Sequence, residues 1–147
     1  MLQLRPHPEG GHYRELWVDT PSDGSRGIGS AIFYLLQAGE RSHWHRFDAI
    51  EAWHFYAGDP LRLKISLEGK STHEVILGNN FAEGHQPFVL VSKGHWHTAE
   101  PLGRWTLVGC TVWPAFLFSN FELAPQEWMA EQTAITSFEE SNLNEHE

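Results

Sequence analysis

The stretch RSHWHRFDAIEAWHFYAG, from Arg41 to Gly58, contains three histidines, one glutamate and two tryptophans. Side chains two residues apart on an extended strand point to one face, so His43 and His45 are expected side by side, with Cα atoms about 6–7 Å apart. Glu51 follows after a short connection, where an antiparallel neighbour would bring its carboxylate to that face. The stretch therefore predicts either a metal-binding pair of strands or an aromatic core that contains histidines.

The rest of the chain has the same rhythm of short, strand-like segments. Runs rich in Val, Ile, Phe, Trp and Thr are separated by Gly and Pro clusters, a pattern typical of all-β proteins with, here, about seven to nine strands. Residues 61–68 alternate apolar and polar side chains, so one face is expected to be packed and the other solvated. The expected strands lie within residues 10–21, 29–39, 50–60, 61–69, 71–78, 86–94 and 104–113.

Length and charge restrict the classes of protein that need to be considered. The chain has 147 residues, 41% of them hydrophobic, which suits one packed domain over residues 1–128. A short helix is expected after Pro125, because proline suits the first helical turn, and residues 129–147 form a polar, acidic C-terminal tail. A net charge of −9 argues against a nucleic-acid partner, which would require a basic surface.

The cysteine content and the hydropathy of the sequence indicate in which cellular compartment the protein is expected. The only cysteine, Cys110, cannot form an internal disulfide and is expected to be a buried strand thiol. No apolar run approaches the length of about 18 residues that a membrane span requires, and no secretory signal opens the sequence. We therefore expect a cytoplasmic protein with no membrane partner.

A third histidine extends the candidate site. His97 follows a glycine-containing turn in SKGHWH and would enter the site from a distant strand. Together, His43, His45, Glu51 and His97 form a mixed set of nitrogen and oxygen ligands that suits Fe(II), Mn(II), Ni(II), Zn(II) or Cu(II). The three imidazoles are expected to converge on one point, with the carboxylate approaching it. Hydrogen-bonded histidines without a metal are the alternative interpretation.

These motifs resemble those of a known superfamily. HWHRFDAIEAWHFYAG resembles the first cupin motif, in which a His-x-His pair, a glutamate and a closing glycine, here Gly58, follow one another. SKGHWH resembles the second motif, although Ser92 replaces its proline. HPEGGHYRELW, EAWHFYAGDPL and WTLVGCTVWPAF resemble the cupin 5 subgroup, once called domain of unknown function 985. The resemblance implies a double-stranded β-helix, the cupin jelly roll, and the four metal ligands named above.

Strand parity suggests which residues line a pocket inside such a barrel. If Glu51 points inward, Trp53 and Phe55 share its strand face, and the indole N–H of Trp53 would suit the edge of a ligand. On the first long strand, Tyr13 and Glu15 share one face and would suit a polar ligand, whereas Arg14 lies on the other face and would suit a carboxylate or phosphate. Both faces of this strand remain open as the one that lines the pocket. The candidate ligand-binding residues are therefore Tyr13, Glu15, Trp53 and Phe55.

Three functions remain open for such a chain, because cupins host all of them. The first is a metal-dependent enzyme acting on a small polar metabolite that is sugar-like or carboxylate-like. The second is a metal-independent isomerase or epimerase, with His45 or His97 as general base and Tyr34 or Tyr13 as acid. The third is a non-catalytic module that binds a small molecule. A homodimer is expected, because a jelly roll exposes edge strands and the first long strand is rich in aromatic residues.

Overall fold

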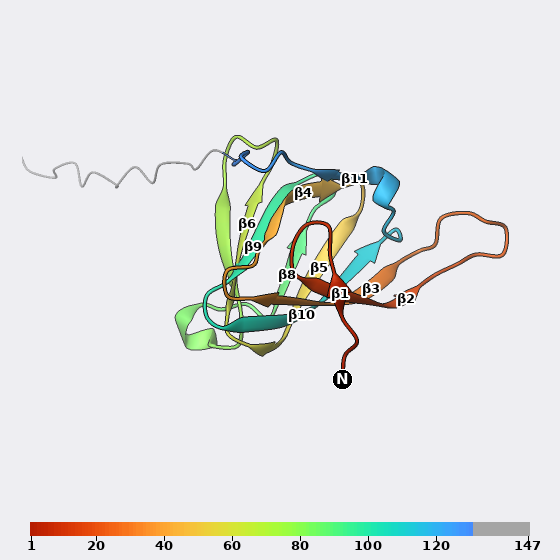
Figure 1. The fold of residues 1–147 in the computed structure, drawn as a ribbon. Coiled ribbons are helices and arrows are strands. Elements are labelled where there is room, and N and C mark those ends of the chain that lie inside the picture. The colour runs from red at the N-terminus through yellow and green to blue at the C-terminus, as the bar shows by residue number, and fades with distance from the viewer. Residues whose placement is uncertain (131–147) are drawn as a thin grey trace, which may run out of the picture.

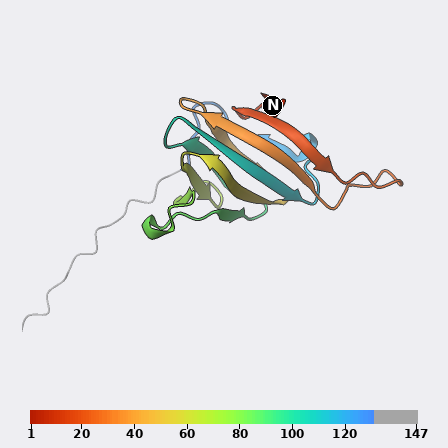
Figure 2. The same cartoon turned by 90° about the horizontal axis from the view of Figure 1, so that it is seen from below.

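Residues 1–130 are described by the computed structural model, and their strands form two antiparallel sheets packed face to face (Figure 1). One sheet has the strand order β1-β2-β3-β10-β5-β8, and the other has the order β11-β4-β9-β6-β7. Figure 2 shows the larger sheet from below, with β2, β3, β10, β5 and β8 side by side. The strands are β1 Arg5–Pro6, β2 His12–Val18, β3 Ser30–Gln37, β4 Ser42–Phe47, β5 Ile50–Gly58, β6 Leu61–Ser66, β7 His73–Leu77, β8 Phe88–Val91, β9 Trp96–Pro101, β10 Trp105–Trp113 and β11 Phe121–Leu123, with 3-10 helices η1 Phe81–Glu83 and η2 Phe118–Asn120.

The core lies between the two sheets and follows the alternation of the sequence. On β6, Leu61, Leu63 and Ile65 are buried while Arg62 and Lys64 point outward. Because side chains alternate across a strand, one face of β6 packs on the opposite sheet and the other meets solvent. The apolar core contains side chains from both sheets, namely Tyr34, Leu36, Trp53, Leu61, Leu63, Ile65, Leu77, Val89, Val91, Ala99, Val108 and Cys110.

The predicted all-β jelly roll is confirmed, and each predicted segment contains a strand. The structure adds the two-residue β1 and the three-residue β11 at the sheet edges, and it makes β4 and β9 neighbours through pairing of His45 with His97. Cys110 is buried on β10, as expected. Among residues 1–130, no helix is long and apolar enough to cross a membrane.

The helix expected after Pro125 requires a correction. Residues 125–130 contain a turn, closed by a hydrogen bond from the Trp128 amide to the Pro125 carbonyl, and no helix. The Trp128 ring packs against Trp44 and Trp96, at centroid distances of 5.7 and 4.8 Å, and these contacts hold the segment against the sheet. The rest of the expected helix and nearly all of the acidic tail lie outside the described residues.

Candidate metal centre

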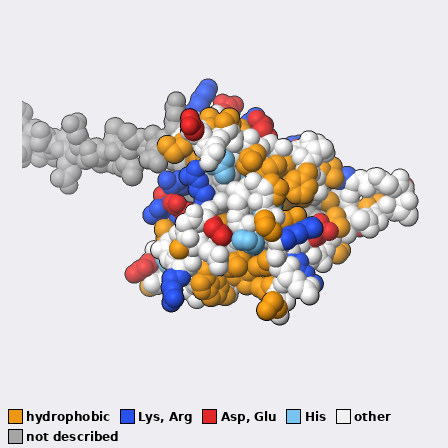
Figure 3. Space-filling view, viewed as in Figure 1, with side chains coloured by type: hydrophobic (Ala, Val, Ile, Leu, Met, Phe, Trp, Pro, Cys, Tyr) orange, Lys and Arg blue, Asp and Glu red, His pale blue; other side chains and the backbone are white. Residues whose placement is uncertain are grey.

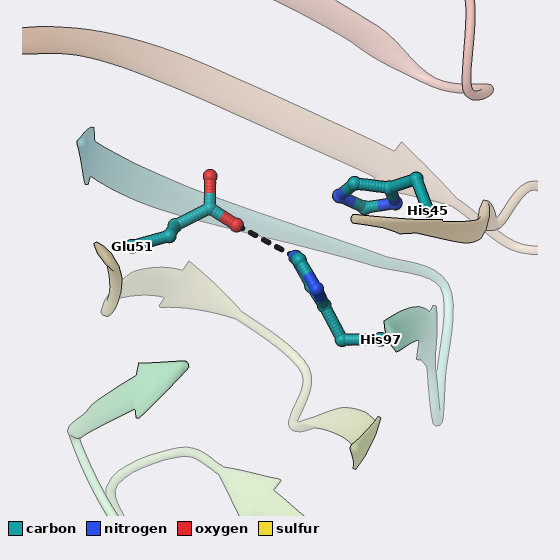
Figure 4. A group of neighbouring side chains, drawn as sticks. All are labelled: His45, Glu51 and His97. Atoms are coloured by element: carbon teal, nitrogen blue, oxygen red, sulfur yellow. Dashed lines mark hydrogen bonds and ion pairs between the residues drawn. The ribbon is translucent and has the colours of Figure 1, made fainter. Parts of the chain in front are cut away.

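Three buried side chains from three strands converge inside the barrel. His45 on β4, Glu51 on β5 and His97 on β9 offer ligand atoms that lie within 4.8 Å of one another. Figure 4 shows the three side chains pointing toward a common region, with the Glu51 carboxylate 2.9 Å from Nε2 of His97. The rings of His45 and His97 lie 4.0 Å apart, because the two residues are paired across β4 and β9. The strand pairing therefore brings the second cupin-like motif onto the first.

The backbone fixes which nitrogen of each imidazole faces the centre. Nδ1 of His45 lies 2.8 Å from the His43 carbonyl, and Nδ1 of His97 lies 3.2 Å from the His95 carbonyl. A carbonyl only accepts hydrogen bonds, so a ring that carries its proton on Nδ1 bonds its carbonyl and turns an Nε2 lone pair inward. Histidines that bind metals in proteins are oriented in this way by a backbone or carboxylate acceptor.

Each Nε2 has a carboxylate oxygen within 3.2 Å. Nε2 of His97 faces Glu51 at 2.9 Å, and Nε2 of His45 faces Oε2 of Glu9 at 3.2 Å. Two acceptors repel at such distances unless a proton or a cation lies between them. Ligands about 2.1 Å from one metal, at tetrahedral or octahedral angles, are themselves about 3.0–3.4 Å apart. The two imidazole–carboxylate contacts therefore match the spacing between neighbouring ligands of a divalent metal.

Glu9 contacts this group of three through His45, and the sequence motifs do not include it. It is 8% exposed and accepts a hydrogen bond of 2.9 Å from the Ser42 hydroxyl. The turn of residues 8–11 carries it inward, and the amide of His43 donates to its carbonyl at 2.8 Å. Gly10 adopts a φ of 111°, which a residue with a side chain rarely adopts. The PEGG sequence signalled this turn but not the burial of its glutamate.

His43, expected at the same point, lies elsewhere. The pairing of β4 with β9 shifts register between Ser42 and His45, so β4 holds one residue more than its partner across this interval. Such a β-bulge breaks the rule that residues two apart share a face. Ser42 and His45 are consequently both buried, and the ring of His43 is left outside the centre.

Burial and mutual repulsion control the ionisation of this group. Burial, reinforced by the charge of Glu51, raises the pKa of Glu9 well above its usual range. Burial, reinforced by His97, lowers the pKa of His45 well below the usual value of 6.5. Both shifts favour uncharged side chains when no metal is bound.

Tyr34, the candidate acid, is buried beside Glu9. Its hydroxyl donates a hydrogen bond to the carbonyl of Gly10. Burial and the neighbouring Glu9 raise its pKa well above 10. Tyr34 therefore holds the glycine turn in place, and it is not among the residues that line the cavity.

The remaining candidates divide between the core and a cavity. Tyr13 and Glu15 line a cavity of about 100 Å³, together with Glu9 and Glu51. Trp53 is buried, with its ring 6.1 Å from that of His97, and Phe55 packs on the core. The other cavity residues, several of them aromatic, are Arg5, His7, Ser30, Ile32, Phe47, Cys110, Val112, Phe116 and Phe118.

One polar atom near the centre has no partner. Nε1 of Trp53 is the buried side-chain nitrogen or oxygen that makes no hydrogen bond among the described residues. An unpaired buried donor costs free energy unless a water molecule or a ligand accepts from it. This observation suits the expected role of Trp53 at the edge of a ligand, although Trp53 does not line the cavity itself.

Two antiparallel sheets that enclose histidines and carboxylates on neighbouring strands define a cupin-type barrel. The chain belongs to the Cupin superfamily (DUF985), whose Cupin_5 family model matches residues 1–124. The subgroup resemblance read from the sequence is thus confirmed. No curated protein matches the chain.

Solved structures with the same fold include relatives at two levels of similarity. A protein from Shewanella oneidensis is 40% identical, with a TM-score of 0.81 over 86% of this chain and 81% of that one. A hypothetical protein from Leishmania major is 28% identical, with a TM-score of 0.77 over 85% and 84% of the two chains. Oxalate decarboxylase from Bacillus subtilis is 14% identical, with a TM-score of 0.63 over 80% of this chain and 29% of its own length. The last similarity shows the fold alone.

Proposed function

We propose that this protein binds a small polar metabolite in its barrel at a divalent metal held by His45, Glu51 and His97. The carboxylate of Glu9, which faces the same nitrogen of His45, completes the donor set. The observation that carries the proposal is the pair of buried contacts between an imidazole nitrogen and a carboxylate oxygen, each of which needs a cation or a proton between the two atoms. Two nitrogens and two carboxylates suit Fe(II), Mn(II), Ni(II) or Zn(II).

The surroundings of the metal group support a ligand that is polar at one end. Glu51 and Glu9 border the cavity, so a ligand there would lie directly beside the metal. Tyr13 and Glu15 provide hydrogen-bonding groups, and aromatic residues such as Phe116 cover the remaining wall. Such mixed walls are typical of small-molecule sites. A bound divalent metal would supply Lewis-acid polarisation of a ligand oxygen.

Metal content measured on protein without a histidine tag tests the metal centre. After incubation with Fe(II), Mn(II), Ni(II) or Zn(II) and desalting, we expect about one equivalent of one metal per chain. His97→Ala and Glu51→Gln should lose it. His43→Gln is the matched control, because this histidine lies outside the centre, and it should retain the metal.

Absence of metal from the wild-type protein under all four conditions would contradict the metal centre. Equal loss of metal in His43→Gln would contradict the ligand assignment. The first result would favour acid–base chemistry or plain ligand binding in the same cavity, with a neutral His45 as the base that its lowered pKa permits.

We further propose a homodimer that functions in the cytoplasm. The outer face of the six-stranded sheet exposes large apolar side chains from several strands, including Trp17, Tyr56, Phe88 and Leu90. Exposed apolar side chains grouped on one sheet face are typical of protein interfaces. A single buried cysteine, with no disulfide among the described residues, suits a reducing compartment.

A further inference from the structure

A second cavity lies on the outer face of the five-stranded sheet, separate from the barrel interior. It has a volume of about 280 Å³, close to the lower size of sites for small metabolites, about 300 Å³. Its floor is formed by the outward side chains of β4, β6 and β9, and its rim by the segment after β11. The lining residues are Arg41, Trp44, Arg62, Lys64, Thr72, Thr98, Glu100, Met129 and Ala130.

The cations of this outer cleft are not all neutralised. Arg62 bonds the carboxylates of both Glu74 and Glu100, at 3.1 Å each, and so accounts for the acidic groups beside it. Lys64 lies opposite Thr98 on one side and Glu74 on the other, but makes no ion pair within residues 1–130. Arg41 likewise has no carboxylate partner in this part of the chain. Figure 3 shows Lys and Arg side chains gathered over the region of β6 and β7.

His43 holds one of these free cations in position. A guanidinium of Arg41 donates to Nδ1 of His43 at 3.3 Å, and Nε2 of His43 donates to the carbonyl of Pro125 at 2.9 Å. Because a guanidinium only donates and a carbonyl only accepts, the two contacts agree on one neutral tautomer of His43. The bulge that removes His43 from the metal centre therefore places it between Arg41 and the segment that forms the rim.

We propose that the outer cleft binds a small phosphorylated metabolite, with its phosphate between Arg41 and Lys64. A phosphate monoester carries about −1.5 to −2 charges and three acceptor oxygens, which match two cations that have several N–H donors and no carboxylate partner within residues 1–130. Thr98 donates its hydroxyl proton to the Ser42 carbonyl, at 2.6 Å, so the donors come from the two cations. Trp44, buried beneath the cleft, offers an apolar surface to the rest of the ligand.

This site does not depend on the proposed metal centre, because the two lie on opposite faces of the same sheet. Thr98 and Trp44 point outward, whereas their chain neighbours His97 and His45 point inward. The test therefore uses the full chain freed of metal by chelation and dialysis. Inorganic phosphate and glycerol 3-phosphate are titrated at low ionic strength by calorimetry, and chemical shifts of the backbone amides locate the site.

We expect saturable binding of both probes, with shifts along β4, β6 and β9 and at the Trp44 indole. Lys64→Gln and Arg41→Gln should each weaken binding about ten-fold or more, because each removes a charged donor to the phosphate. Lys93→Gln is the matched control: it removes the same charge from an exposed position outside the cleft and should change affinity less than about two-fold.

Three results would overturn the proposal. The first is a lack of saturable binding to the wild-type chain. The second is an equal loss of affinity in Lys93→Gln, which would indicate a nonspecific effect of charge. The third is a set of shifts centred on Glu51 and His97, which would place the phosphate in the barrel instead of the outer cleft.

Discussion

Glu9 brings a second carboxylate into a space that already contains Glu51, and its pKa is raised by burial and by that neighbour. A carboxyl whose pKa is raised in the folded state stabilises the fold least at high pH, because ionisation is easier in the unfolded chain. A bound metal reverses this balance, since it favours the ionised carboxylate. Glu9 therefore lowers the free energy of unfolding at high pH when no metal is bound and raises it when a metal is bound.

The substitution Glu9→Gln separates these two effects. In metal-free protein, we expect the free energy of unfolding of the wild type to fall relative to the variant as the pH rises from 5 to 8.5, measured by urea unfolding. We expect metal affinity in the variant to fall by about 10–100-fold, the range seen when partners of metal sites are removed. If the free energy of unfolding of the wild type instead rises relative to that of the variant as the pH rises, this account of Glu9 is contradicted.

His7 gives the opposite dependence on pH. Burial lowers its pKa from 6.5 to about 4. Between these pH values, His7 is therefore protonated in the unfolded chain and neutral in the folded protein. Its contribution to stability is present above pH 6.5 and is lost as the pH falls to 4, by up to about 3 kcal/mol. Urea unfolding of His7→Gln should show a shallower loss over this range than the wild type. His73→Gln, at an exposed position, should follow the wild type.

The turn between β1 and β2 holds Glu9 in position. A Cβ atom on Gly10 would lie 2.0 Å from the carbonyl oxygen of Arg41, just before β4, and Gly10 has a positive φ of 111°. Gly24 also has a positive φ, of 77°, but a Cβ atom there would meet nothing within 4 Å. Comparing alanine substitutions at these two glycines therefore separates the cost of the backbone conformation from the cost of the steric clash.

We expect Gly10→Ala to lower the free energy of unfolding by about 2–4 kcal/mol, because the turn must move off β4 or accept the clash. Gly24→Ala should cost about 1 kcal/mol, from the backbone conformation alone. Urea unfolding measures both values. Metal binding by the Gly10 variant should also weaken, since Glu9 moves with the turn. Equal costs for the two variants would show that the contact with Arg41 is unimportant.

The sequence predicted those elements whose pattern is local. Residues 61–65 alternate so regularly that their buried and exposed faces follow directly, but the predicted alternation fails beyond them, where Ser66 is buried and Leu67 is exposed. The glycine turn before His97 placed that histidine on a strand end. His45, Glu51 and His97 were brought together by their motifs, and the structure places them within reach of one metal. The strand alternation and the family motifs were therefore sufficient for the barrel and for most of the centre.

The parts that escaped prediction depend on contacts between distant segments. His43 would share a face with His45 only on a regular strand. The bulge in β4 that breaks this regularity arises from its pairing with β9. The burial of Glu9 depends on Ser42, 33 residues away, so no pattern around Pro8 reveals it. The turn at Pro125 depends on packing of the Trp128 ring against Trp44 and Trp96 on two strands. Single-strand patterns do not contain this information.

The whole molecule exposes an apolar sheet face that a partner copy would cover. Sedimentation equilibrium at micromolar concentration should give about twice the chain mass of 16.8 kDa. Leu90→Glu, on the outer face of β8, should shift the mass toward the monomer because it places a charge in the interface. Leu67→Glu, exposed after β6 on the other sheet, is the control. A monomeric wild type would exclude the homodimer.

We expect the N-terminal segment to control how quickly the proposed metal centre exchanges with solvent. Glu9 reaches His45 from a turn that is anchored by the two-residue, exposed strand β1 and by the His43 amide. Opening of residues 5–11 would uncover one side of the centre while the barrel stays folded, and such local openings need far less free energy than global unfolding. Amide hydrogen exchange at His43 reports this opening. A metal bound beside Glu9 should slow that exchange, because it adds a bond that the opening must break.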